Sequence, residues 1–119
     1  MKDFKARAKS TKTDGLFKDR KRHKLEEMAN MYPNGFTVIE FRKLTGPNGP
    51  FWLFGYKEDP TSCFGGSSVL DRIAESWVDE GEEIAAASDD LKASGGVKMV
   101  LKLTKSSNGR DYYDAVILD

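Results

Sequence analysis

Aromatic side chains recur at every second position of one short stretch, and aromatic rings are the groups on which nucleobases stack. In an extended strand Trp52, Phe54 and Tyr56 share one face. Phe51 and Leu53 share the opposite face. Because a small single-sheet barrel cannot bury both faces equally, we expect the second pair to face the core and the triplet to form an exposed stacking platform. The alternative is that the triplet packs under a helix or in a subunit interface.

Cations flank this stretch and a second aromatic group near the end of the chain. Beside the triplet, the cations that could contact phosphates are Arg42, Lys43 and Lys57. The second group surrounds a predicted turn at residues 107–109 and consists of Lys98, Lys102, Lys105, Arg110, Tyr112 and Tyr113. This pattern favours a basic, aromatic-edged hairpin that binds a nucleic-acid strand. An ordinary amphipathic hairpin with one solvated face has the same pattern.

The formal net charge of zero hides two segments of opposite charge. Residues 1–24 hold ten Lys or Arg against three Asp, a net charge of +7, and the remaining 95 residues carry −7. A polyanion would therefore be attracted to the first segment. In it, the further candidate phosphate contacts are Arg20, Lys21 and Arg22. The acids concentrate at residues 71–90, which we interpret as a solvated helix face or as a docking surface for partner proteins.

The residue types needed for catalysis or metal binding are sparse. His23 and Cys63 are the single histidine and the single cysteine, and they are far apart in sequence, so neither a metal-ligand cluster nor a nucleophile–base pair is indicated. Neighbouring acids such as Asp89 and Asp90 lie in polar sequence that would not shift their pKa values. We predict no catalytic residue, no metal and no cofactor. The single cysteine and the lack of a long apolar run favour a cytoplasmic protein that does not enter a membrane.

These groups need elements to position them. We expect residues 1–17 to form a flexible basic arm and residues 18–119 to form one domain. Residues 18–32 fit either a helix or a strand. Alternating or β-branched residues predict strands at 36–44, 51–57, 97–104 and 112–118, the first two joined by a turn at 46–49 and the last two by a turn at 107–109.

The middle of the chain is expected to hold one helix. Apolar residues at helical spacing predict a helix over residues 69–80, with Ser68 as its N-cap and Gly81 at its end. A looser segment with Pro60 precedes it. A short strand at 83–87 and a loop up to Gly96 would follow. The order of strands, helix and strands argues for a mainly β domain.

Four short motifs occur in an order that resembles a known family. They are Phe51-Trp52-Leu53-Phe54-Gly55, the helix face with Leu70, Ala74 and Trp77, residues 80–84 (EGEEI) and residues 108–113 (NGRDYY). Together, over residues 36–118, they resemble the single-stranded DNA-binding proteins of OB fold, in the compact form that phages such as those of lactococci encode. The resemblance implies a five-stranded OB barrel with one helix inserted before the last strands. It also implies base stacking at Phe54 and a basic hairpin loop at residues 105–110.

The sequence therefore favours sequence-independent binding of single-stranded DNA in replication and recombination. Homo-oligomers, a dimer or a tetramer, are expected because one small barrel offers a short track, and replication or recombination proteins are possible partners. The bacterial members end in a Gly-rich linker and an acidic tail, whereas this sequence ends at Asp119, so we do not expect recruitment through such a tail. Two alternatives remain: a protein–protein adaptor or inhibitor that uses the aromatic triplet as anchors, and an RNA-binding OB protein of the cold-shock kind.

Overall fold

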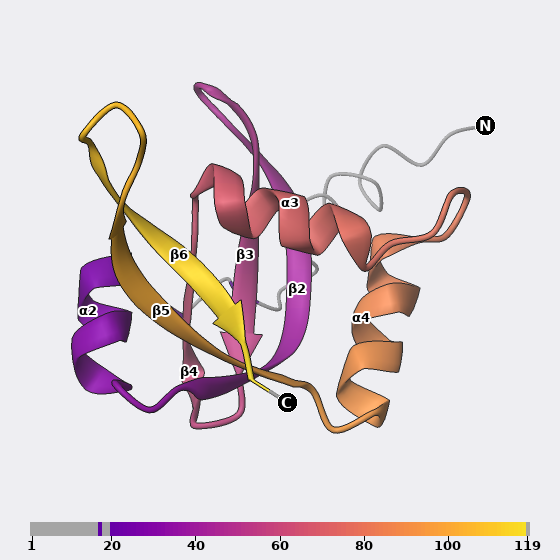
Figure 1. Ribbon diagram of the computed structural model, residues 1–119. Helices are drawn as coiled ribbons and strands as arrows, with labels where there is room; N and C mark the ends of the chain where they lie inside the picture. Colours follow the sequence, from indigo (N-terminus) through magenta and orange to yellow (C-terminus); the bar gives the residue numbers. More distant parts are fainter. Residues whose placement is uncertain (1–16, 18–19, 119) are drawn as a thin grey trace.

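The computed structural model describes Phe17 and residues 20–118. Six strands of these residues form one sheet: β1 (Lys21–His23), β2 (Phe36–Gly46), β3 (Gly49–Tyr56), β4 (Asp59–Gly65), β5 (Val97–Lys105) and β6 (Asp111–Ile117). Three helices accompany it: α2 (Leu25–Met31), α3 (Ser68–Ser76) and α4 (Ile84–Ala93). The fold is thus mixed α and β (Figure 1), built on a larger sheet than the sequence predicted.

The sheet has the strand order β1-β4-β3-β2-β5-β6 and curls into a half barrel (Figure 1). The long strand β2 produces the curl, because its first residues pair with β5 and its remainder pairs with β3. The register shifts between Val38 and Glu40 and between Phe54 and Tyr56, and such interruptions of a ladder bend and twist strands. No pair between β4 and β6 closes the barrel in the described residues. Instead, α2 contacts both β4 and β5, and α3 contacts both β3 and β6.

The expected five-stranded barrel with one helix is therefore wrong in its number of strands and helices. Residues 18–32, for which helix and strand both stayed open, contain one of each, β1 and α2. The segment read as loose is the strand β4, which pairs antiparallel with β3 and parallel with β1. Its Pro60 is tolerated because it lies next to the start of the strand, where Pro removes no essential ladder bond.

The segment predicted as a strand and loop, residues 83–96, holds the helix α4 over residues 84–93, and only residues 94–96 after it are loop. Ile84, Ala87 and Leu91 recur at helical spacing and pack against the core. The buried Ser88 also accepts a hydrogen bond from the backbone N–H of Phe41, 3.1 Å away. Ser88, which the sequence placed in a polar loop, thus has a tertiary partner that no local pattern reveals.

The predicted central helix exists, but it is shorter and begins one residue earlier. Its N-cap is Ser67, whose hydroxyl accepts from the N–H of Leu70, and not Ser68. It ends at Ser76 with Trp77 as C-cap, four residues before the expected end at Glu80, so Gly81 does not terminate it. Leu70 and Ala74 are fully buried and Trp77 packs against the main core, as their spacing predicted, whereas Val69 and Ile73 are only partly buried.

The sheet is covered on both faces. The main core lies between its inner face and the helices, and the largest fully buried side chains there include Phe36, Phe41, Phe64, Met28 and Met99. A second, smaller core lies on the other face of β3 and β4, where Phe17, Leu53 and Cys63 are buried together. Phe17 was assigned to the flexible arm, but it is only 5% exposed. Residues 1–16 lie outside the described residues, so the arm itself stays a prediction.

Candidate nucleic-acid interface

The aromatic triplet expected to form an exposed platform is part of the main core. Trp52, Phe54 and Tyr56 are 4%, 0% and 1% exposed. The ring of Phe54 stacks on that of Phe64 at 5.4 Å between centroids. The expectation of an exposed platform is wrong because the helices cover this face of β3 while a second cluster covers the other face. Burial also raises the pKa of the Tyr56 hydroxyl above its ordinary value.

The predicted basic hairpin forms, and its polar side chains reach solvent. Lys98, Lys102, Lys105, Arg110 and Tyr112 are exposed, whereas Tyr113 is half-buried and packs against the main core. The register places Lys102 opposite Asp114 and Lys105 opposite Asp111. The two strand lysines are therefore balanced by acids, and Arg110 lies in the turn outside the paired register.

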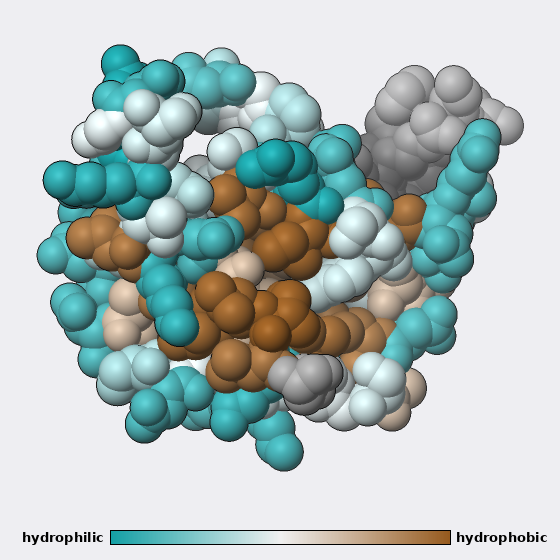
Figure 2. All heavy atoms as spheres, in the orientation of Figure 1, coloured by the Kyte–Doolittle hydropathy of each residue, from teal (hydrophilic) through white to brown (hydrophobic). Residues whose placement is uncertain are grey.

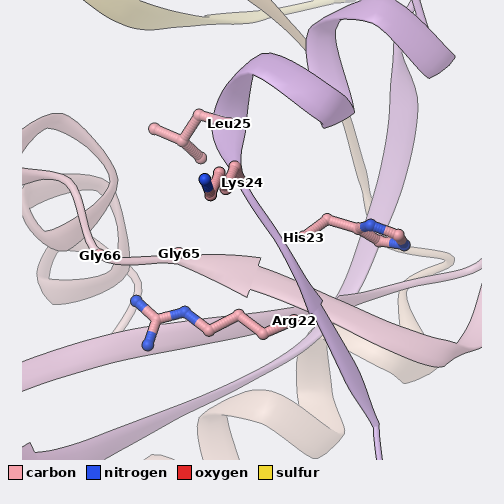
Figure 3. A pocket seen from close by; sticks show the side chains of 6 residues that line it. All are labelled: Arg22, His23, Lys24, Leu25, Gly65 and Gly66. Carbon is pink, nitrogen blue, oxygen red and sulfur yellow. The ribbon is translucent and has the colours of Figure 1, made fainter.

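Three hollows lie on either side of residues 65–67: the first touches the β2–β3 turn and the third touches the β5–β6 hairpin, and we call them together the inter-hairpin groove. The first, about 270 Å³, lies between Arg22, Gly66 and the β2–β3 turn at residues 46–51. The second, about 450 Å³, shares Arg22 and Gly66 and continues along Lys24 (Figure 3). The third, about 430 Å³, begins at the next residue, Ser67, and is lined by the start of α3 and by the β5–β6 hairpin. Figure 1 shows both hairpin tips at one end of the molecule with the start of α3 between them.

Arg22 is the most clearly positioned cation of this groove. Its guanidinium lies over the ring of Phe51, 5.2 Å from the centroid, in a cation–π contact. Gly66 leaves the space for it: a Cβ on this residue would stand 2.6 Å from Nη2 of Arg22, and its φ of +91° also favours glycine. Phe51, which we placed in the core, is only partly buried and lines the first hollow. An arginine stacked on an aromatic ring at a groove wall can bind phosphate and base together.

Two groove cations were absent from the predicted site. Lys24 lines the second hollow and Arg72 lines the third. The sequence feature that could have indicated this part of the groove is residues 65–68 (GGSS). They form a turn that places Ser67, Ser68 and the start of α3 at the groove. Backbone N–H groups at a helix start favour anions, as Arg72 does, while Asp114 on the opposite wall of the third hollow opposes them.

Several predicted contacts lie elsewhere. Lys57 lies at the β3–β4 turn, and Lys98 lies at the beginning of β5, each at the opposite end of its strand from the hairpin tips. Arg42 is partly buried and donates to the carbonyl of Phe41 at 2.9 Å. Lys43 stands over the Trp52 ring at 5.6 Å, and Lys21 is exposed on β1. The groove therefore gathers Arg22, Tyr112 and Tyr113 of the predicted set, with Lys105 and Arg110 at the adjoining tip.

Arg20 is engaged inside the protein. Its guanidinium forms an ion pair of 2.9 Å with Glu40, which a second cation, Lys92 of α4, approaches at 3.2 Å. Glu40 is only 7% exposed, and Gly55 gives the pair its room, since a Cβ there would stand 2.5 Å from the Arg20 guanidinium. A buried carboxylate needs such partners, so the structure gives Arg20 a structural task that the charge count did not reveal.

A constellation that looks catalytic in outline lies beside the groove. Nε2 of His23 is 3.1 Å from Oγ of Ser62, and Nδ1 is 3.5 Å from Oε2 of Glu27. However, the Ser62 hydroxyl donates its hydrogen to Oδ2 of Asp59 at 2.7 Å, so it must accept from Nε2–H of the imidazole. A serine nucleophile needs the reverse direction, with its own proton passing to the histidine. Ser62 is moreover 2% exposed, so this arrangement does not fit an activated nucleophile.

Two further properties bear on the function. Within residues 20–118 and Phe17 no group of three or more His, Cys, Asp or Glu side chains is arranged to hold a metal ion. None of the helices described above is long and apolar enough to cross a membrane. Figure 2 shows apolar surface gathered in the middle of one face, over β6 and α3, and polar surface at the hairpin tips.

Comparisons with known proteins provide no relative from which a function could be proposed. No protein-family model, no curated protein and no solved structure matches this chain at a significant level.

Proposed function

We propose that this protein binds single-stranded DNA without sequence preference, with the inter-hairpin groove as its track. The observation that carries the proposal is the Arg22–Phe51 contact at the wall of a row of hollows between two hairpin tips. Arg22, Lys24 and Arg72 would meet phosphates, Phe51 would hold the Arg22 guanidinium in place, and Tyr112 and Tyr113 would meet bases. Stacking accepts any base, and phosphate contacts carry no sequence information, so low sequence preference follows.

The order of the strands supports the same proposal. Without β1, the chain runs through β2, β3 and β4, then through helices, then through β5 and β6, with β2 pairing to both β3 and β5. This connectivity supports our proposal that the domain is an OB fold, open between its third and fifth strands. OB folds bind oligonucleotides beside the loops between strands 1 and 2 and between strands 4 and 5, which correspond here to the two hairpin turns.

Anisotropy titration of labelled dT oligomers of increasing length, at two salt concentrations, tests the proposal. Binding should weaken as salt rises, and duplex DNA of the same length should bind less well. Arg22→Gln should lower the affinity about tenfold, the value of one charged contact, whereas Lys57→Gln at the opposite end should leave it unchanged. Equal losses in both variants, or no binding of dT at low salt, would refute the groove as the site. An external label is needed because Trp52 is buried.

Competition with a matched RNA oligomer separates the DNA proposal from the RNA-binding alternative. A preference of tenfold or more for the RNA would replace the proposed ligand while keeping the groove. The adaptor alternative has lost the aromatic anchors on which it rested, because Trp52, Phe54 and Tyr56 are buried.

We also propose that the protein forms homo-oligomers, because one groove is short for a strand-coating protein. The apolar surface over β6 in Figure 2 supports a contact between copies. Ile117 of β6 is 46% exposed, and Leu103 of the paired strand β5 is 60% exposed. Light scattering coupled to size-exclusion chromatography should give a mass above that of one chain. Ile117→Lys should lower that mass, and a monomer in both samples would contradict the proposal.

A further inference from the structure

The strand that carries Arg22 is short and lies at the edge of the sheet. β1 has three residues and pairs on one side only, with Ser62, Cys63 and Phe64 of β4. So few ladder hydrogen bonds hold a strand weakly, since edge segments with little pairing open most readily. The position of the Arg22 guanidinium over the Phe51 ring therefore depends on the other contacts that hold β1 in place.

Arg20 holds the chain just before β1 through its ion pair with Glu40, and His23 holds the end of β1, on the face opposite Arg22. Successive side chains of a strand alternate, and Figure 3 shows Arg22 and His23 pointing away from each other. His23 is 8% exposed, and its Nε2–H donates to Ser62, which passes its own hydrogen to Asp59. The chain of donors thus has one direction and ends on a carboxylate whose pKa is lowered by hydrogen bonds from Thr61 and Ser62.

Glu27 caps the start of the helix that follows His23. One of its carboxylate oxygens accepts from the N–H of Lys24 at 3.0 Å, and the other faces Nδ1 of His23 at 3.5 Å. The backbone bond to Lys24 is the main cause that lowers the pKa of Glu27. His23 is therefore hydrogen-bonded to β4 through Ser62, whereas Glu27 lies near its Nδ1 without a hydrogen bond, since Nδ1 has no hydrogen-bond partner among the described residues.

We propose that His23 is a positioning residue of the inter-hairpin groove: through Ser62 it fixes β1 so that Arg22 lies over Phe51, ready to contact a phosphate. This inference rests on the proposed binding of single-stranded DNA. It assigns the buried histidine a role in DNA affinity although the side chain does not touch the strand.

A double-mutant cycle measured with a dT oligomer tests this role. His23→Leu removes the donor, and Arg22→Gln removes the charge that the donor positions. If His23 acts through Arg22, the double variant should bind no more weakly than Arg22→Gln alone, a loss of about tenfold. His23→Gln, whose amide can still donate to Ser62, should retain most of the wild-type affinity. Losses that multiply in the double variant would overturn the proposal.

Arg72 provides the matched control. It lies in the third hollow, on α3 and not on β1, so the losses from His23→Leu and Arg72→Gln should multiply. Thermal unfolding of every variant shows whether the chain is still folded. A general loss of structure would reduce the effect of both arginines alike, whereas a positioning role removes the effect of Arg22 only.

A measurement without DNA separates failure of this inference from failure of the proposed function. Cys63 pairs with Arg22 in the β1–β4 register, is 1% exposed and is the single thiol of the chain. His23→Leu should increase the rate of thiol labelling several-fold at fixed pH, and His23→Gln should not. If labelling rises but no DNA binds, the proposed function fails and the fixation of β1 stands. If DNA binds and labelling is unchanged in His23→Leu, the positioning role is overturned.

Discussion

The β2–β3 and β5–β6 hairpins look alike in sequence and differ in environment. Each alternates large apolar residues with polar or aromatic ones, carries cations and turns at an Asn-Gly pair. Strand β3 has a neighbour on each side and a packed cluster on each face. In contrast, β5 pairs with β2 only over residues 97–99, and beyond that the β5–β6 hairpin is a two-stranded arm on which Leu103 is 60% exposed. Alternation predicts a strand equally well in both hairpins, but only tertiary contacts decide which face is free.

Truncating one aromatic in each hairpin should give the largest difference. Phe54→Ala removes a ring with no exposure that packs on Phe64 and near Trp77, so the free energy of unfolding should fall by about 4 kcal/mol. Tyr112→Ala, at 38% exposure, should change it by less than about 1 kcal/mol. Urea denaturation monitored by circular dichroism measures both. Similar losses would mean that the β5–β6 arm is packed as tightly as β3.

Two arginines, Arg20 just before β1 and Arg22 within it, should separate stability from binding. Arg20→Gln breaks the pair with the buried Glu40 and should lower the free energy of unfolding by about 3 kcal/mol. Arg22→Gln loses a contact to Phe51 and should cost less than about 1 kcal/mol, with its main effect on DNA affinity. Denaturation and anisotropy on the same samples distinguish the two. A loss of affinity in Arg20→Gln that exceeds its unfolded fraction would restore Arg20 as a DNA contact.

The two hairpins and the two arginines show which parts of the fold could be predicted from the sequence and which could not. Strands β2, β3, β5 and β6 and the helix α3 follow from alternation, turn residues and helical spacing, because those signals are local. Strand β4 and helix α4 do not, because β4 depends on partners on both sides and α4 depends on contacts such as Ser88 with Phe41. The cations of the hairpin tip were predictable from composition.

The groove itself was not predictable, since its parts come from distant positions. Arg22, Phe51 and Gly66 meet only because β1 adds to the edge of β4 and because a glycine leaves space for the guanidinium. The burial of Phe54 was missed for a related reason: the sequence contains two apolar clusters on opposite faces of β3, and a prediction of one core assigned the wrong face to solvent.

The glycine beside the β2–β3 hairpin allows a finer test of the groove. Gly66→Ala places a Cβ where Arg22 passes, and Gly95→Ala, at a nearly equal φ of +95° against +91°, meets no atom within 4 Å. Both variants should lose about 1 kcal/mol of stability from the positive φ. Only Gly66→Ala should also lose DNA affinity, by about threefold to tenfold, because the guanidinium must move. Equal affinities would show that the position of Arg22 over Phe51 does not matter for binding.

The smallest expected difference lies within the β5–β6 hairpin and concerns salt. Lys102 is opposite Asp114 in the register, whereas Arg110 lies in the turn, so only the arginine should release a counterion when DNA binds. Arg110→Gln should therefore flatten the dependence of affinity on salt by about one phosphate contact, which is about threefold between 50 and 200 mM salt. Lys102→Gln should leave that slope unchanged. If Lys102→Gln flattens the slope as much as Arg110→Gln does, DNA reaches the strands of the arm as well as its tip, and the track extends beyond the inter-hairpin groove.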